Sequence, residues 1–179
     1  AIKAGVSEPN SMVLATAAAG GMPSARIVLL RSFDSNDFVF FADHNSRKGR
    51  ELSENPHAAL LFYWAELGRQ VRVEGVVSQG TTDTAAELIG PSNGSLGLRS
   101  EQAGSVHGFL TQKFTERAKR WQAIRTSPTA TWGAYVLRPN AFEFWQGLEG
   151  SLPVRLFYTR AGKIWRLNGP AGPGNDMGI

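Results

Sequence analysis

The sequence predicts a mainly β protein with flanking helices, of the α+β class, and two patterns support this prediction. From Ser11 to Ser78, short runs rich in β-branched and aromatic residues alternate with clusters of turn residues, which is typical of antiparallel strands connected in order. From Val106 to Arg125, apolar residues instead recur at helical spacing. A chain of 179 residues can bury a core without disulfides, so one domain over residues 1–168 is expected.

The N-terminal part contains five expected strands, each bounded by turn residues. They are Ser11 to Thr16, Ser24 to Phe33, Phe38 to Ala42, Ala58 to Trp64 and Gln70 to Ser78. Glycines and Pro23 separate the first two strands, and Asp34 to Asp37 separate the second from the third. Glu66, Leu67 and Gly68 connect the last two strands as a hairpin.

Three segments are expected to be helical. Ser46 caps a short helix that Asn55 and the following proline end. A second helix is expected from Thr82 to Ile89, and a third from Val106 to Arg125. The aromatic stripe of the third helix is expected to pack on the sheet, so we assign it no chemistry.

Further strands are expected in the C-terminal part. They are Trp132 to Leu137, Ala141 to Gln146, Leu152 to Thr159 and Lys163 to Leu167. A turn at residues 160–162 joins the last two. Residues 169–179 are rich in glycine and proline and lack periodicity, so they are predicted to form a disordered tail.

The composition excludes several kinds of chemistry. The chain has no cysteine, which rules out disulfides and thiolate sites and is compatible with the cytoplasm, where we expect the protein. No apolar run approaches the roughly 20 residues of a membrane span, and the first ten residues lack the apolar segment of a signal peptide. His44, His57 and His107 lack metal-ligand spacing, so no metal is expected.

The balance of charge is compatible with an anionic small-molecule ligand. The net charge of +4 rests on 14 arginines and five lysines, and arginine suits bidentate recognition of phosphate or carboxylate. The arginines are scattered among apolar strands and form no basic stripe, so nucleic acid is not expected as a partner. The chain also lacks a GxGxxG or Walker-type loop, which argues against dinucleotide and triphosphate folds.

Basic residues cluster in two places, and phosphate would be their common target. Arg47 and Lys48 follow Ser46 at the start of the short helix, where free N–H groups and the helix dipole favour an anion. The alternative, a solvated helix surface, is the commoner role of such a segment. Arg26 lies in an apolar strand and needs an anionic partner or a strand end in water. Arg31, five residues later, lies on the opposite face unless a bulge intervenes.

Other polar residues give weaker signals. Gln70, in a strand interior, offers an amide donor and acceptor to the edge of a heterocycle, although such side chains more often face water. Trp145, in the EFWQG run, and Arg155, in the next strand, are equally compatible with core and rim positions. None of these residues is diagnostic singly.

Several runs of the sequence, taken in order, resemble the pyridoxine (pyridoxamine) 5′-phosphate oxidase family. The runs are SEPNSMVLAT, RIVLLR, SRKGREL, NPHAALLFYW, RQVRVEG, EFWQG and IWRL. They match in identity and in separation over nearly the whole chain. The resemblance implies a six-stranded antiparallel split β-barrel and a homodimer with FMN at the subunit interface. It also implies the oxidation of a small molecule with dioxygen as the acceptor.

The resemblance further implies which residues bind FMN. They are Arg26, Ile27, Val28, Leu29, Leu30, Arg31, Phe41, Ala42, Arg47, Lys48, Gln70, Gln102, Trp145 and Arg155. Arg26, Arg47 and Lys48 would neutralise the phosphate, and Gln70 and Trp145 would lie near the ring system. No side chain is expected to be catalytic, because N5 of the flavin accepts the hydride.

The expected substrate site departs from the family pattern. The family has an RLHDR run whose arginine and histidine bind the substrate, and this chain has Ser151 and Pro153 at those two positions. The run keeps its leucine and Arg155, which is expected near the flavin pyrimidine. Arg31 stands where the family has a lysine shared between cofactor and substrate. We therefore expect Arg31, Ser151 and Pro153 at the substrate. Each lost phosphate contact would cost about 1.5–3 kcal/mol of binding, which argues against a vitamin B6 phosphate.

Three functions remain open from the sequence. The first is an FMN-dependent oxidase that dehydrogenates a small nitrogen-containing or partly reduced aromatic metabolite, similar to the oxidases of phenazine biosynthesis. The second is a pyridoxine or pyridoxamine 5′-phosphate oxidase with a rebuilt phosphate site. The third is a non-catalytic flavin-binding protein.

Overall fold

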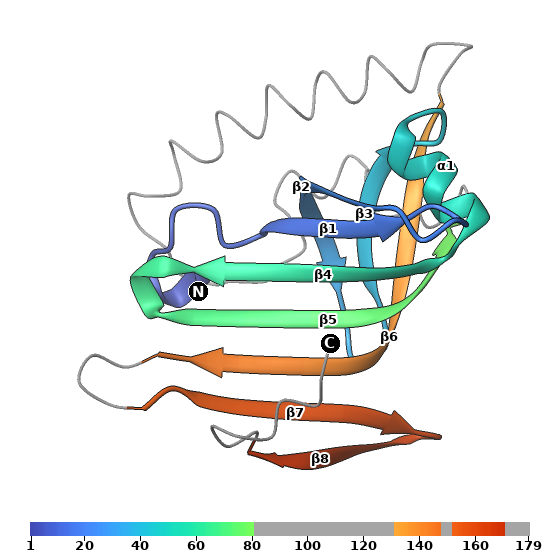
Figure 1. The fold of residues 1–179 in the computed structure, drawn as a ribbon. Helices are drawn as coiled ribbons and strands as arrows, with labels where there is room; N and C mark the ends of the chain where they lie inside the picture. The colour runs from blue at the N-terminus through green and yellow to red at the C-terminus, as the bar shows by residue number, and fades with distance from the viewer. Residues whose placement is uncertain (81–130, 148–151, 171–179) are drawn as a thin grey trace.

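The structure, a computed structural model, describes residues 1–80, 131–147 and 152–170 (Figure 1). Its strands are β1 (Ser11–Ala17), β2 (Pro23–Phe33), β3 (Phe38–Asp43), β4 (His57–Trp64), β5 (Arg69–Gln79), β6 (Trp132–Gln146), β7 (Val154–Ala161) and β8 (Ile164–Pro170). Its helices are the 3-10 turns η1 (Ile2–Ala4) and η2 (Ala65–Leu67) and the α-helix α1 (Arg47–Glu54). All the strands belong to one sheet in which every neighbouring pair is antiparallel.

The first six strands close into a barrel. Their order is β3-β2-β1-β4-β5-β6, and β3 also pairs with β6, which joins the two ends of this order. β7 and β8 continue the sheet beyond the barrel. The mainly β class and the six-stranded antiparallel split barrel are therefore confirmed.

Strand β6 belongs to both parts of the sheet. Its first half, Trp132 to Leu137, pairs with β3, and its second half, Ala141 to Gln146, pairs with β7. The prediction of two separate strands here was wrong, because the residues between the halves continue the strand. Gly75 of β5 lies opposite Pro139 and the preceding Glu74 lies opposite Ala141, so Asn140 is an extra residue that forms a bulge.

Gly75 allows β6 to come close at this bulge. A Cβ atom at this position would collide with the backbone carbonyl of Arg138. Only glycine therefore fits without a shift of one strand. The bulge bends β6 between the half that closes the barrel and the half that carries β7.

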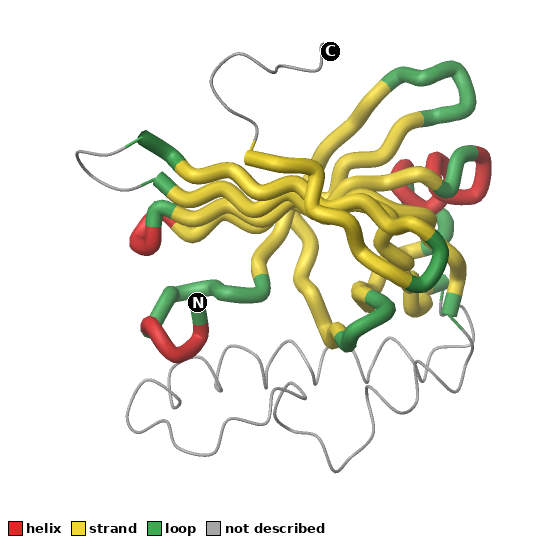
Figure 2. Tube along the Cα trace, turned by 90° about the horizontal axis from the view of Figure 1, so that it is seen from below, coloured by secondary structure: helices red, strands yellow, loops and turns green. Residues whose placement is uncertain are grey.

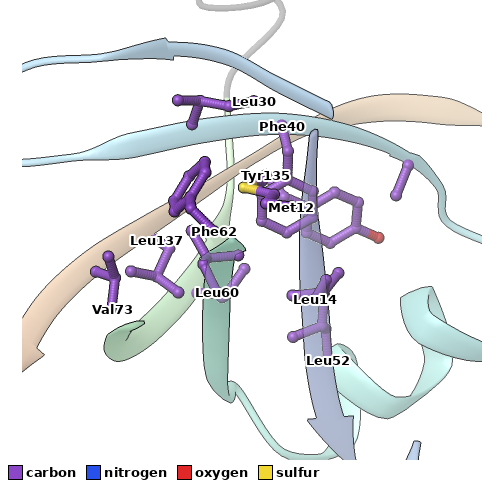
Figure 3. Close-up of a cluster of buried hydrophobic side chains, with 12 residues drawn as sticks. Met12, Leu14, Leu30, Phe40, Leu52, Leu60, Phe62, Val73, Tyr135 and Leu137 are labelled. Atoms are coloured by element: carbon purple, nitrogen blue, oxygen red, sulfur yellow. The ribbon is translucent and has the colours of Figure 1, made fainter. Parts of the chain in front are cut away.

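The core fills the interior of the barrel and follows the alternation of the strands. In β1, Met12, Leu14 and Thr16 are buried and the intervening residues are partly exposed. Figure 3 shows the resulting cluster, with Leu52 of α1 beside Leu14. Leu52 is buried in the same cluster, so its packing anchors α1 to the barrel wall.

The helix α1 and the turn η2 lie at opposite ends of the β4–β5 hairpin, as Figures 1 and 2 both show. The chain order requires this, because α1 leads into the start of β4 and η2 follows its end. A strand of eight residues spans roughly 27 Å. Residues at the start of α1 and residues at the start of β5 are therefore far apart within one chain.

The other predicted strands and helices agree with the structure in part. The five N-terminal strands agree with their expected bounds to within one residue at each end. The short helix is present, and the Ser46 hydroxyl accepts a hydrogen bond from the Gly49 N–H. β8 continues to Pro170, so residues 169 and 170 belong to a strand and not to the expected tail. The helices expected from Thr82 and from Val106, and residues 171–179, lie outside the described residues. No helix within the described ranges is long and apolar enough to cross a membrane.

Candidate functional site

A buried carboxylate, Glu51, connects two of the expected phosphate-binding arginines. Glu51 lies on the second turn of α1, and its side chain is only 6% exposed. Its Oε2 lies 3.1 Å from Nη2 of Arg26 in β2, and its Oε1 lies 2.8 Å from Nε of Arg47 at the start of α1. An arginine from a strand and an arginine from a helix are thus held by one side chain.

Arg26 is fixed by both of its terminal nitrogens. Nη1 donates to the carbonyl of Leu14 at 3.0 Å and to the hydroxyl of Thr16 at 2.7 Å. Nη2 donates to the hydroxyl of Ser24 and to Glu51. The anionic partner that Arg26 requires in an apolar strand is therefore Glu51, and the guanidinium retains a fixed orientation.

The surroundings of Glu51 keep it ionised. Hydrogen bonds from Ser24 at 2.6 Å and from Thr16 at 2.5 Å lower the pKa of Glu51, and those from Arg47 and Arg26 lower it further, to about 2. Burial acts in the opposite direction but does not prevail. The carboxylate is therefore a permanent acceptor at any ordinary pH.

Lys48 completes a cationic group beside α1. Burial, and then the positive charge of Arg26, lower the pKa of Lys48, whereas the negative charge of Asp43 raises it. The Lys48 ammonium also lies 6.0 Å from the centre of the Trp132 ring. With Glu51 and Asp43 ionised, Arg26, Arg47 and Lys48 leave a net charge of about +1, so the group remains cationic and suits an anion.

A second group of expected site residues lies side by side in three neighbouring strands. Gln70 of β5 pairs with Trp145 of β6, and Trp145 pairs with Arg155 of β7. Arg155 forms an ion pair with Glu143, whose other oxygen lies 2.6 Å from Nη2 of Arg72. A buried glutamate thus holds two arginines here as well.

The structure does not bring these two groups together within one chain. The cationic group surrounds the start of α1, whereas Gln70 pairs with Tyr63 at the far end of the β4–β5 hairpin. A single small molecule can contact both groups only if they come from different subunits. The separation is thus compatible with a site shared across a subunit interface.

The remaining expected residues have different surroundings. Arg31 lies at a register shift between β2 and β3, and its guanidinium lies 5.5 Å from the centre of the Phe41 ring. Burial lowers the pKa of Arg31. Arg26 instead faces Glu51, so the two arginines share no partner in the described residues. Ile27 is 71% exposed, whereas Ala42 is fully buried.

Six further expected residues lie in β2, beside β7 or outside the described part of the chain. Val28 and Leu29 are partly buried in β2, and Leu30 belongs to the core. Pro153 is exposed immediately before β7. Gln102 and Ser151 lie outside the described residues.

An apolar cavity of about 650 Å³ lies at the other end of the barrel, near η1. Its aromatic lining consists of Phe33, Phe38, Phe62, Trp64, Phe142 and Phe144. It shares only Leu30 with the expected FMN contacts. The cavity is therefore separate from the cationic group.

Sequence reasoning missed the two glutamates. Glu51 follows Arg47 by four residues, a spacing that favours an ion pair on a helix, so a signal was present. Its contacts with Thr16 and Ser24 depend on the fold. Glu143 alternates with the apolar Phe142 and Phe144, so its sequence pattern resembles that of an ordinary exposed strand residue.

Comparisons with protein families match most of the chain. Residues 1–97 match the family described as pyridoxamine 5′-phosphate oxidase. Residues 132–169 match the pyridoxine 5′-phosphate oxidase C-terminal dimerisation region. The second match covers β6, β7 and nearly all of β8, so the sheet that extends the barrel corresponds to this region.

Similar proteins from several bacteria carry the name pyridoxine/pyridoxamine 5′-phosphate oxidase. The protein from Rubrobacter xylanophilus is 42% identical over 171 residues, which cover 93% of this chain and 79% of the relative. The protein from Paraburkholderia phymatum is 45% identical over 166 residues, which cover 90% of this chain and 78% of the relative.

Solved structures share the fold. PhzG from Burkholderia lata 383, in complex with tetrahydrophenazine-1-carboxylic acid, has a TM-score of 0.69 at 28% identity and covers 93% of this chain and 84% of its own. A pyridoxamine 5′-phosphate oxidase-related, FMN binding protein from Nostoc punctiforme has a TM-score of 0.62 at 18% identity. It covers 94% of this chain and 90% of its own, and at that identity it supports the fold alone.

Proposed function

The chain belongs to the pyridoxamine 5′-phosphate oxidase family, and from this premise we propose that it is an FMN-dependent oxidase of a small nitrogen-containing or partly reduced aromatic metabolite. In such a reaction the substrate loses two electrons and two protons, and dioxygen takes them up to become hydrogen peroxide. FMN, when bound, supplies the two-electron redox chemistry. The residues of this chain bind and orient the reactants.

The observation that carries this proposal is the cationic group at the start of α1. Arg26 and Arg47 both bind Glu51, and Lys48 follows Arg47 on α1, so three cations and one buried anion lie at the start of this helix. This charge fits the ribityl phosphate of FMN. We infer that these residues hold the phosphate and that Gln70, Trp145 and Arg155 approach the ring system.

We further propose a homodimer in which each FMN contacts both subunits. The match of residues 132–169 to a dimerisation region supports the dimer. The placement of the phosphate group and the ring group at opposite ends of the β4–β5 hairpin supports a site built from two chains. Each protomer would then contribute its cationic group to one site and its ring group to the other.

Two residues of this chain replace side chains that bind the substrate in the family. Ser151 and Pro153 stand where the family has an arginine and a histidine, so this chain lacks side chains suited to a second phosphate there. The likeness to PhzG, solved with a partly reduced nitrogen heterocycle, supports a substrate of that class. Gain of aromaticity makes such a dehydrogenation favourable without a strong side-chain acid or base.

A second candidate is a pyridoxine or pyridoxamine 5′-phosphate oxidase. The relatives at 42% and 45% identity that carry this name favour it. Oxygen uptake with a tetrahydrophenazine carboxylate, compared with pyridoxine 5′-phosphate and pyridoxamine 5′-phosphate, separates the two candidates. Faster turnover of either B6 phosphate would replace the first candidate with the second, and uptake with none of the compounds would leave a non-catalytic flavin-binding protein.

The cofactor proposal has its own experiment. Purified protein is expected to be yellow and to release FMN on denaturation. The double variant Arg47→Ala, Lys48→Ala is expected to lose the colour, because it removes two of the three cations. Arg50→Ala is the matched control, since Arg50 lies on the same helix but contacts the Asn45 carbonyl and not Glu51. Colourless wild-type protein that ignores added FMN would contradict the proposal.

A further inference from the structure

We propose that Glu51 is a positioning residue that presents Arg26 and Arg47 to the ligand phosphate and thereby sets the preference of the site for FMN over riboflavin. This inference rests on the proposed FMN site and adds to it a residue that does not itself contact the ligand. Riboflavin carries the same ring system as FMN but has no phosphate. Its affinity therefore measures the contacts of the site with the rest of the flavin and not those of the cationic group with the phosphate.

The two carboxylate oxygens of Glu51 have different hydrogen-bond partners. Oε2 accepts from Thr16, Ser24 and Arg26, which fixes the carboxylate against β1 and β2. Oε1 is thereby directed at Arg47, from which it accepts a hydrogen bond. The carboxylate is thus held by three hydrogen bonds through Oε2 and orients an exposed side chain through Oε1.

The orientation of the Arg47 guanidinium depends most on Glu51. Its side chain is 62% exposed, and in the described residues its only partner is Glu51, bound through Nε. The contact through Nε leaves Nη1 and Nη2 of Arg47 without a partner in the described residues and available to an anion. Holding the guanidinium in place lowers the rotational entropy that an exposed arginine would lose on binding.

Arg26 has a complementary role. Both of its Nη atoms are occupied by Leu14, Thr16, Ser24 and Glu51, so only Nε remains to donate to a ligand. Arg26 therefore acts mainly as a fixed charge, and Arg47 supplies the Nη donors that have no partner in the described residues. Glu51 couples the two, because the same carboxylate contacts both.

Two roles can be assigned to a carboxylate in this position, and they predict opposite effects. A counter-ion that competes with phosphate would weaken FMN binding, and its neutralisation would strengthen binding. A positioning residue would strengthen FMN binding, and its loss would weaken it. The positioning role is favoured by the immobilised Oε2 and by the Nη atoms of Arg47, which have no partner within the described part of the chain.

The test compares the affinities of the protein for FMN and for riboflavin after removal of bound flavin. In Glu51→Gln, the amide has one acceptor oxygen where the carboxylate has two. It can therefore replace only one of the two acceptors, and we expect Arg47 to lose its hydrogen bond. Affinity for FMN is expected to fall about ten-fold, while affinity for riboflavin changes less than about two-fold. Glu51→Asp keeps the charge but shortens the reach, and it is expected to lose the same preference. Glu54→Gln, an exposed carboxylate on the same helix, is the control and is expected to change neither affinity.

Several outcomes would overturn the inference. Equal loss of FMN and riboflavin affinity would show a purely structural role, and tighter FMN binding in Glu51→Gln would show a competing counter-ion. Normal FMN preference in Glu51→Asp would show that charge alone matters. If the wild type binds neither flavin, the proposed function fails, and stabilisation by inorganic phosphate then tests the inference by itself. A phosphate-dependent rise in Tm in the wild type that is absent in Glu51→Gln would support it, and an equal rise, or none in either protein, would refute it.

Discussion

The carboxylate of Glu143 and the guanidinium of Arg155 form an ion pair across β6 and β7, with 3.1 Å between Oε1 and Nε. Glu143 is 7% exposed at its side chain, and its second oxygen binds Arg72 of β5. One carboxylate therefore links three neighbouring strands at the point where the sheet leaves the barrel. The arrangement repeats that of Glu51 with Arg26 and Arg47.

We predict that Glu143→Gln destabilises the protein by about 1–3 kcal/mol, because the amide leaves one of two arginines without its acceptor. Chemical denaturation gives the free energy of unfolding. Glu74→Gln is the matched control, since Glu74 also pairs with Arg72 but is 42% exposed, and its loss should cost less than about 1 kcal/mol. Equal losses in the two variants would show that the burial of Glu143 is unimportant.

We predict that Arg26→Lys lowers FMN affinity by about 10- to 100-fold. A lysine has no planar fork with which to contact Leu14, Thr16 and Glu51 together, so its charge is not held in place. Fluorescence titration of FMN measures the change, with Arg50→Lys on the neighbouring helix as the control. Wild-type affinity in Arg26→Lys would show that charge without orientation is sufficient.

We predict that the contribution of Glu51 to stability disappears in acid. Its folded-state pKa of about 2 lies below the ordinary value of 4.5, so the ionised carboxylate stabilises the fold above about pH 4.5. The contribution is lost as the pH falls from there through about 2. The difference in unfolding free energy between wild type and Glu51→Gln should therefore be constant near neutral pH and narrow across this window. Urea denaturation at several pH values measures it, and a constant gap down to pH ~2 would contradict the assignment.

We predict that Gly75→Ala destabilises the barrel by about 1–3 kcal/mol, because the new methyl group would meet the Arg138 carbonyl and push β5 and β6 apart. Thermal or chemical denaturation measures the loss. Gly20→Ala is the control, since a Cβ there meets no atom within 4 Å. An unchanged Tm in Gly75→Ala would mean that the bulge at Asn140 can relax.

The fold was largely predictable because most of its signals are local. In β1 to β5, alternating apolar residues and turn clusters lie within a few residues of each other, and the predicted bounds agree with the structure. β6 was different, because Pro139 and Asn140 have the composition of a turn. Only the pairing with β5, and the space left by Gly75, show that the strand continues.

The candidate site was less predictable from the residues themselves. The sequence placed Arg47 and Lys48 at a helix start, which the structure confirms, and the family resemblance supplied the rest of the set. The partners of Arg26 could not be found in this way, because Glu51 is 25 residues away along the chain and meets it only after β2 and α1 pack. The assignment of individual residues to FMN stays a prediction.

The position of β7 outside the closed barrel has a consequence for how such a protein can diversify. β7 contacts β6 and β8 but takes no part in barrel closure, so exchanges at Pro153, an exposed residue just before β7, leave the six-stranded core intact. Selection can therefore alter this exposed position between lineages while the closed barrel is inherited unchanged. Descendants of one ancestral barrel would then differ beside β7 long before they differ in how they fold.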